Sequence, residues 1–188
     1  MDLVTRVKNI IVDPVSEWRV IESEPDTPGG ILKNYVMILA AIPAVCGFIG
    51  TSIIGVGPIR TGIVSGLIMA VIGYVLTLIG VYIVALVVDI LAPKFGGRKN
   101  FNSAFKVAAY APTAAWVASA FTAIPILSIF TVLGLYSFYL FYLGLPALMK
   151  APQDKAVGYV LAVIVCVIIL WVLILAIPGM VIGVRIAL

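Results

Sequence analysis

Long apolar stretches, separated by short polar connections, make up most of the chain after residue 30. Five of them are long enough to cross the roughly 30 Å hydrocarbon core of a bilayer as helices, which takes about 20 residues. They cover residues 31–56, 62–91, 104–124, 126–149 and 157–187. The third is the weakest, because Pro112 and several small residues interrupt it, and Pro125 predicts a tight helical hairpin between the third and the fourth. The pattern predicts an all-α membrane protein in which residues 31–188 form a five-helix transmembrane domain.

The first 30 residues have a different pattern, in which apolar side chains recur at three- or four-residue spacing among charged ones. This apolar stripe consists of Val7, Ile11, Val15, Trp18 and Ile21. Asp13 and Pro14 suit the N-cap and first position of a helix. We expect residues 1–30 to form a cytoplasmic amphipathic helical segment on the membrane surface. Its wet side would hold the charged residues, among them Arg6, Lys8, Glu17, Arg19, Glu22 and Glu24.

Basic residues are distributed unevenly among the connections of the predicted helices. One side of the membrane would hold Arg6, Lys8, Arg19, Lys33, Lys94, Arg98, Lys99, Lys106, Lys150 and Lys155. The other side would hold only Arg60 and Arg185. Because cytoplasmic connections carry the excess of Lys and Arg, we expect the N-terminus in the cytoplasm and the C-terminus outside. Tyrosine and tryptophan residues near the helix ends would form interfacial belts, and these are Trp18, Tyr35, Tyr142 and Tyr159.

The composition agrees with a lipid environment and limits the kinds of binding site and active site that the chain can form. Hydrophobic residues make up 63% of the chain and charged residues 11%, far from the balance of a soluble domain. The basic residues are scattered among apolar blocks and do not form the face that a nucleic-acid-binding protein needs. The chain has no histidine, which excludes His-based zinc sites and catalytic triads. We expect no cofactor, and expect Cys46 and Cys166 to be small buried side chains and not a redox pair.

Small residues recur along one side of the second predicted helix. The stripe includes Gly62, Gly66, Gly73 and Gly80. Small residues at this spacing let helix backbones approach closely in lipid. Two interpretations remain open: the stripe packs against other helices of the same chain, or it forms an interface with a second copy of the chain.

Two charges are placed unfavourably within the predicted spans. Asp89 is the only acidic residue in a span, and it lies at the C-terminal end of a helix, where the helix dipole disfavours a carboxylate. Lys106 has the opposite mismatch in the first turn of the next helix. We expect Asp89 and Lys106 to pair, with Lys94 as a competing partner or with Asp89 exposed at headgroup depth. Candidate contacts for an anionic lipid are Lys94, Arg98 and Lys99.

Several short motifs resemble the bacterial branch of the Yip family. They are Pro14 with Trp18, Gly96-Gly97 before Phe101, Ala109-Tyr110 before Pro112, and the run Tyr142-Leu-Gly144-Leu-Pro146. The resemblance implies an integral protein of a bacterial plasma (inner) membrane with five spans and a cytosolic N-terminus. Eukaryotic members of the family bind Rab-type GTPases and act in vesicle trafficking. This chain lacks their Asp-Leu-Tyr-Gly-Pro type of signature, so the resemblance does not extend to Rab binding.

Two functions remain as hypotheses. The first is a non-catalytic scaffold that organises the membrane or acts in trafficking, with lipid, an anionic lipid headgroup or a second copy of the chain as partners. The second is a small channel or transporter with a polar site near Asp89, since prolines interrupt several predicted helices. An enzyme is not expected, because no span holds paired carboxylates or a histidine.

Overall fold

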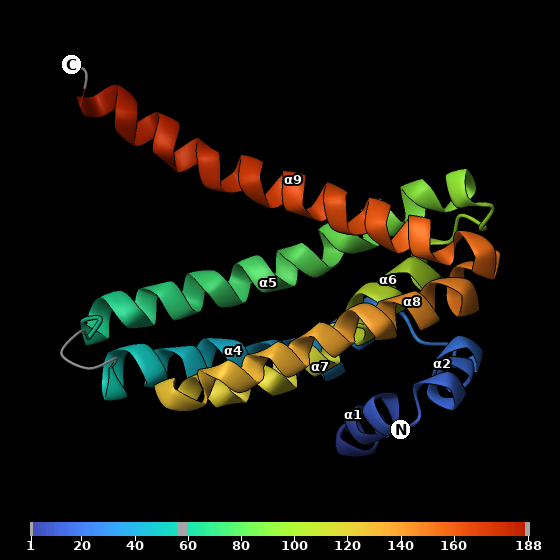
Figure 1. The fold of residues 1–188 in the computed structure, drawn as a ribbon, viewed down its shortest axis with the longest axis horizontal. Coiled ribbons are helices and arrows are strands. Elements are labelled where there is room, and N and C mark those ends of the chain that lie inside the picture. The colour runs from blue at the N-terminus through green and yellow to red at the C-terminus, as the bar shows by residue number, and fades with distance from the viewer. Residues whose placement is uncertain (1, 56–59, 187–188) are drawn as a thin grey trace.

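The computed structural model describes the backbone of residues 2–55 and 60–186, and it describes side chains as far as residue 169. This part of the chain is helical throughout (Figure 1). Two short helices come first, α1 (Leu3–Val12) and α2 (Pro14–Ser23). The remaining helices are α3 (Pro28–Ile31), η1 (Leu32–Val36), α4 (Met37–Phe48), η2 (Ile49–Ile54), α5 (Ile63–Leu91), η3 (Ala92–Phe95), α6 (Phe101–Tyr110), α7 (Thr113–Ala118), η4 (Ser119–Ala123), η5 (Pro125–Leu135), α8 (Tyr136–Met149) and α9 (Gln153–Ile186).

Three helical stretches are long and apolar enough to cross a membrane. They are Pro28–Ile54, Ile63–Phe95 and Pro125–Met149, and they correspond to the first, second and fourth predicted spans. The chain is therefore a helical membrane protein, but five spans are not confirmed. Most of the fifth predicted span belongs to α9, and its side chains from residue 170 onward lie outside the described residues.

The third predicted span is not one continuous helix. Its segment is divided into α6, α7 and η4, with the first break at Ala111 and Pro112. Pro112 has no N–H to donate to the preceding turn, which explains the break. The predicted hairpin is present, because η4 and η5 pack against each other and the chain reverses at Ile124. Residues 104–111 are buried, so α6 is covered by protein and does not face lipid.

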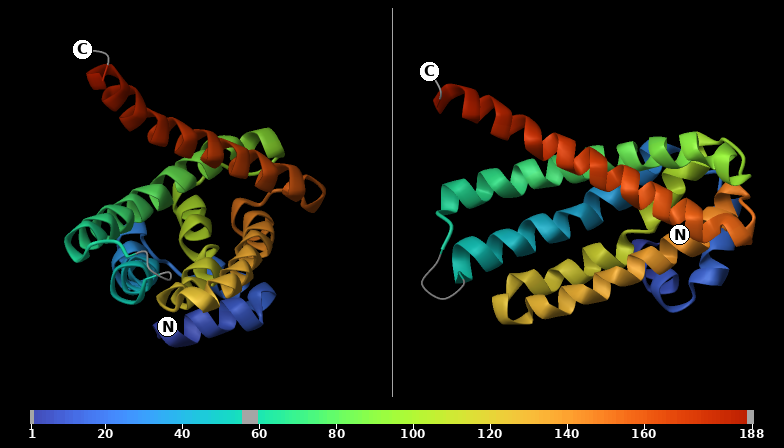
Figure 2. Two further views of the ribbon diagram at one scale, coloured as in Figure 1. Left: turned by 60° about the vertical axis from the view of Figure 1, so that its left-hand side comes forward. Right: turned by 45° about the horizontal axis from the view of Figure 1, so that its top comes forward.

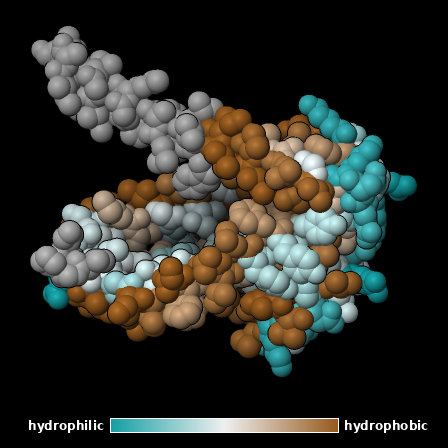
Figure 3. Space-filling view, viewed as in Figure 1, coloured by the Kyte–Doolittle hydropathy of each residue, from teal (hydrophilic) through white to brown (hydrophobic). Residues whose placement is uncertain are grey.

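The polar connections gather at one end of the molecule, which we call the polar end. Figures 1 and 2 show that α1, α2, the α5–α6 connection and the α8–α9 connection lie there, whereas the end of η2, the start of α5 and the η4–η5 reversal lie at the opposite end. Hydrophilic residues cover the polar end in Figure 3, and apolar residues dominate the rest of the visible face. Large exposed apolar side chains lie along α4, α5, η5 and the described part of α9, as expected for helices that contact lipid.

The N-terminal helices begin as predicted but are placed differently. Asp2 and Asp13 cap α1 and α2 by accepting from the backbone N–H of Thr5 and Ser16. The C-terminal part of the apolar stripe is buried against the bundle, since Trp18 and Ile21 are almost inaccessible. These two side chains were wrongly expected at the membrane surface, because α2 packs on α8 and α1 packs on α2 and α7. Val7 and Ile11 are half-buried and Val15 is exposed. We call α1 and α2 together the N-terminal helical pair.

Candidate functional site

An ion cluster inside the N-terminal helical pair holds its two helices together. The guanidinium of Arg6, on α1, is only 4% exposed. Its Nη1 donates to Oε1 of Glu17 on α2 at 2.5 Å, and its Nη2 donates to both carboxylate oxygens of Glu24. Burial by itself would lower the pKa of Arg6, but the hydrogen bond and charge of Glu24 raise it above its ordinary value, so the guanidinium remains charged. Arg6 and Glu17 were therefore wrongly expected on the wet side of the segment.

Lys106 joins the N-terminal helical pair to α6. Its Nζ is buried and donates to the backbone carbonyl oxygen of Ile21 at 2.7 Å and to that of Glu24 at 2.5 Å. The last carbonyls of a helix have no partner within it and form the negative end of its dipole. Lys106 therefore caps the C-terminus of α2, a favourable place for a cation.

The predicted pair of Asp89 and Lys106 is not formed. Lys106 is occupied by the end of α2, and Asp89 makes no ion pair with another described residue. Asp89 is 6% exposed, and its Oδ1 has no hydrogen-bond partner in the described part of the chain. Next to it on α5, Val88 accepts a hydrogen bond through its carbonyl from the hydroxyl of Tyr159, on α9. The prediction failed because Lys106 binds backbone carbonyl oxygens at the end of α2, and the sequence around residue 106 does not indicate that α2 packs there.

Trp18 and Gly144 fix the N-terminal helical pair on α8. Trp18 is 1% exposed, and a Cβ atom at Gly144 would lie 2.7 Å from Cζ2 of its indole ring. Only glycine fits this contact without displacing the ring. Two further contacts strengthen it: the hydroxyl of Tyr136 donates to the carbonyl of Ile11 at 3.1 Å, and Lys150 forms an ion pair with Glu22. Trp18 is thus a packing anchor and not part of an interfacial belt. Tyr35 and Tyr159 are likewise buried in the protein.

The other motif residues shape connections at the polar end. Gly96 adopts φ +77°, which favours glycine, and Gly97 lies where a Cβ atom would be 2.9 Å from the carbonyl oxygen of Met149. The following N–H, from Arg98, donates to this carbonyl at 2.7 Å. The α5–α6 connection is therefore fixed to the end of α8. Lys94, Arg98 and Lys99 are exposed on it, and their contact with an anionic lipid stays a prediction.

The small-residue stripe on α5 is packed at only one of its four glycines. A Cβ atom at Gly66 would lie 1.9 Å from Oγ of Ser52, on η2. The same test at Gly62, Gly73 and Gly80 finds no atom of the described residues within 4 Å. Packing among the described residues thus accounts for Gly66 alone, and the interface with a second copy stays a prediction for the others.

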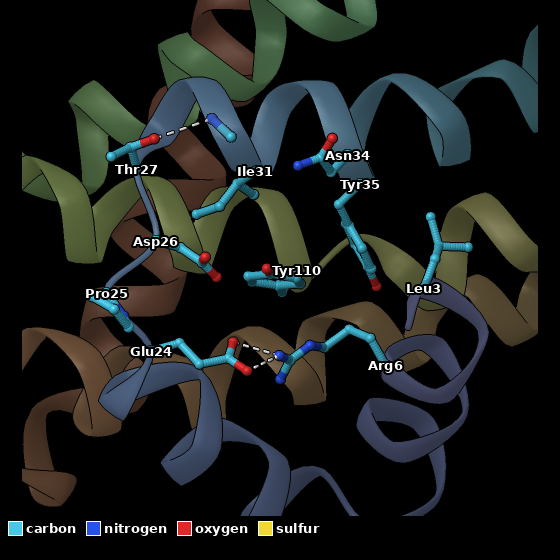
Figure 4. Close-up of a pocket in the computed structure, with 11 residues that line it drawn as sticks. Leu3, Arg6, Glu24, Pro25, Asp26, Thr27, Ile31, Asn34, Tyr35 and Tyr110 are labelled. Carbon is cyan, nitrogen blue, oxygen red and sulfur yellow. Dashed lines mark hydrogen bonds and ion pairs between the residues drawn. The ribbon is translucent and has the colours of Figure 1, made fainter. Parts of the chain in front are cut away.

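A pocket of about 460 Å³ lies between the N-terminal helical pair, the start of the first span and α6. Figure 4 shows its lining side chains, which come from α1, the 24–27 connection, α3, η1 and α6. Its aromatic wall consists of Tyr35 and Tyr110, whose ring centroids are 4.6 Å apart. The guanidinium of Arg6 lies 5.6 Å from the ring centroid of Tyr110, a cation–π distance. Tyr35 is held by a hydrogen bond of 2.7 Å between its hydroxyl and that of Thr113.

The family model for the Yip1 domain matches residues 8–174 of the chain. The chain belongs to the Yip1 domain family. It is similar to "Inner membrane protein YohC" of Escherichia coli (strain K12), with 26% identity over 164 residues, which covers 82% of this chain and 84% of that protein. The protein of the same name from Escherichia coli O6:H1 matches to the same extent. No solved structure matches the chain.

Membership in the Yip1 domain family confirms the resemblance that the motifs indicated. In the structure, most of these motif residues form packing contacts: Trp18 on Gly144, Gly97 on Met149, and Tyr110 against Tyr35. Sequence reasoning missed the partners that make the cluster, namely the buried pairing of Arg6 with Glu17 and Glu24. Their spacing along the chain does not indicate a shared helix face, because the three residues belong to different segments. Arg6 lies on α1, Glu17 lies on α2 after the turn at Asp13, and Glu24 follows the end of α2.

Proposed function

We propose that this Yip1-family membrane protein is a non-catalytic scaffold that organises the surrounding bilayer. The observation that carries the proposal is the attachment of the N-terminal helical pair to the bundle by Lys106, by the ion pair of Lys150 with Glu22, and by Trp18 on Gly144. This attachment places two additional helices beside the long helices near the polar end, as Figure 2 shows. A membrane protein that is wider in one leaflet favours curvature of that bilayer.

The transmembrane domain of residues 31–188 would supply anchorage, and the segment of residues 1–30 would supply width on the cytoplasmic side. The basic residues Lys94, Arg98 and Lys99 are exposed at the same end of the molecule and would attract anionic lipid to the same leaflet. A second copy of the chain could pack along the exposed glycines of α5. Bound anionic lipid and contact with a second copy would both increase the curvature of the bilayer where many molecules of the protein gather.

Reconstitution into vesicles tests the proposal. The full-length protein, at increasing protein-to-lipid ratio, should shift the distribution of vesicle diameters measured by electron cryo-microscopy. The variant Gly144→Leu, which displaces Trp18, should be inserted normally and shift the diameters much less. Gly47→Leu is the matched control, because Gly47 lies on α4, outside the small-residue stripe of α5, and a Cβ atom there has no described atom within 4 Å. Equal shifts for wild type and Gly144→Leu would contradict the role of the N-terminal helical pair.

A channel or transporter is the second candidate, and it is favoured by the buried Oδ1 of Asp89, which has no hydrogen-bond partner among the described residues. An unpaired polar group in a span is costly and is retained where it contacts an ion or solute. The same vesicles, loaded with a pH-sensitive or ion-sensitive dye, provide the test. Flux that Asp89→Asn abolishes, with unchanged vesicle diameters, would favour transport over the scaffold.

A further inference from the structure

We propose that the pocket between the N-terminal helical pair and the first span binds a primary ammonium group carried by a small amphipathic molecule. This goes beyond the scaffold function and does not depend on it. The pocket of about 460 Å³ is large enough for an ethanolamine-sized group. Its lining contains Arg6, Glu24, Asp26, Asn34, Tyr35 and Tyr110, together with apolar side chains.

The charges around this pocket do not balance. Arg6 and Lys106 are the cations of the cluster, and each has its partners: Arg6 is bound by Glu17 and Glu24, and Lys106 by two backbone carbonyls. Asp26 is half-buried in the pocket wall, and no ion pair or hydrogen bond joins its carboxylate to another side chain in the described part of the chain. Among the described residues the cluster therefore keeps one unmatched negative charge, which suits a cationic group beside Asp26 and disfavours an anionic group at that position.

Tyr110 supplies the second observation. It is 4% exposed, yet its hydroxyl makes no hydrogen bond to another described residue, although it lines the pocket. In Figure 4 the carboxylate of Asp26 points toward Tyr110, and no dashed line reaches either group. The hydroxyl is therefore free to bind a ligand that enters the pocket. An ammonium group between them would donate to the carboxylate of Asp26 and to the hydroxyl oxygen of Tyr110.

The pocket selects for N–H donors and against a quaternary ammonium. Quaternary ammonium groups are usually bound by open aromatic faces. Here Arg6 already lies over the ring of Tyr110, and the ring of Tyr35 packs against it. A group without N–H donors would leave the carboxylate and the hydroxyl unsatisfied.

The position of the pocket points to an amphipathic ligand. Ile31, Asn34 and Tyr35 belong to the first turns of the span Pro28–Ile54, so the pocket lies at the depth of lipid headgroups. Leu3 and Ile31 provide an apolar side for the carbon chain next to the nitrogen. A lipid with an ethanolamine headgroup and a free primary amine share the required chemistry.

Thermal unfolding of the full-length protein in detergent, followed by circular dichroism, tests the proposal. It also distinguishes a lipid with an ethanolamine headgroup from a free primary amine as the ligand. The probes are phosphatidylethanolamine, phosphatidylcholine and phosphatidylglycerol with identical acyl chains, and free ethanolamine. Phosphatidylethanolamine should raise the unfolding midpoint more than the other two lipids. A rise with free ethanolamine alone would support the proposal with a soluble amine as ligand.

Two variants remove the groups that bind the ammonium. Asp26→Asn and Tyr110→Phe should each weaken the apparent affinity for phosphatidylethanolamine by about tenfold or more, because a charged or buried hydrogen bond is lost. Asp154→Asn, which removes an exposed carboxylate on α9, should leave the affinity unchanged. Each variant is compared with its own midpoint without lipid, so a change in intrinsic stability does not obscure the result.

Three outcomes would overturn the proposal. They are equal or larger shifts with phosphatidylcholine or phosphatidylglycerol, an affinity for phosphatidylethanolamine that both variants leave unchanged, and no shift with any amine. None of these outcomes depends on vesicle shape, so they are distinguishable from a failure of the scaffold function.

Discussion

Gly144 is the residue at which the attachment of the N-terminal helical pair can be tested most directly. A Cβ atom there would meet the indole ring of Trp18 at 2.7 Å. We expect Gly144→Leu to destabilise the protein by about 1–3 kcal/mol, the usual cost of overpacking, and to release α1 and α2. Trypsin cleavage after the exposed Arg19 should become faster. Gly73→Leu, where the added side chain meets open space, should cleave like the wild type; equal cleavage of both variants would contradict the contact.

Lys106 provides a second prediction at this scale. Replacing it with methionine keeps the apolar stem but leaves the carbonyls of Ile21 and Glu24 without a donor. The expected cost is about 1–3 kcal/mol in the free energy of unfolding. Asp89→Asn should add to this cost independently, because Lys106 and Asp89 have no shared contact. A strong coupling energy between the two substitutions in detergent unfolding would restore the ion pair predicted from sequence.

The packing of α1 against α2 depends on the ion pairs of Arg6, and removing one charge alone leaves its partners unpaired. Arg6→Leu leaves the buried Glu17 and the half-buried Glu24 without their cation, and loss of the partner of a buried charge typically costs about 3–5 kcal/mol. The double variant Arg6→Leu with Glu17→Leu should be less destabilised than the sum of the two single variants. Lys8→Leu, an exposed position on the same helix, is the control. Additive effects would show that the guanidinium and the carboxylate of Glu17 act independently.

The hairpin of η4 and η5 is fixed to the first span by a close backbone contact. A Cβ atom at Gly50 would lie 2.0 Å from the carbonyl oxygen of Thr122, and a backbone atom cannot move aside as a side chain can. Gly50→Ala should therefore lower the unfolding midpoint, by a free energy of about 1–3 kcal/mol. Gly47→Ala, on the same helical stretch with nothing within 4 Å, should have little effect. If both substitutions are tolerated equally, the two segments are not in contact.

The hydropathy pattern predicted the long helices well, because the length of an apolar run directly limits where a span begins and ends. The predicted 62–91 corresponds to α5, and 126–149 corresponds to η5 and α8. The pattern did not predict the placement of the N-terminal helical pair. An apolar stripe has the same spacing whether it faces lipid or protein, and the partner that covers Trp18 is Gly144, far along the chain. The ion cluster was missed for the same reason, since Glu24 contacts Arg6 only after α2 folds back on α1.

At the scale of the whole molecule, the gathering of polar connections at one end makes the orientation testable. The N-terminal helical pair and the α5–α6 and α8–α9 connections share that end (Figure 1), and ten of the twelve basic residues are expected there. Since connections rich in Lys and Arg stay in the cytoplasm, reporter fusions at residue 1 and within 92–100 should be cytoplasmic. A fusion after residue 188 should be outside.

Labelling at the η4–η5 reversal decides how many times the chain crosses the membrane. The segment from α6 to η4 is broken and partly buried, and it leads from the polar end to the reversal at Ile124, where the chain turns back along η5 and α8 to the polar end (Figure 2). This segment and its return either both cross the membrane, as in the five-span prediction, or form a hairpin that enters and leaves on the same side. Both arrangements give an odd number of crossings, so a cytoplasmic C-terminus would contradict the arrangement of the helices itself. Accessibility of a single cysteine at Ser128, next to the reversal, to a membrane-impermeant reagent distinguishes the two cases: labelling from outside supports the crossing, and protection supports the hairpin that does not cross.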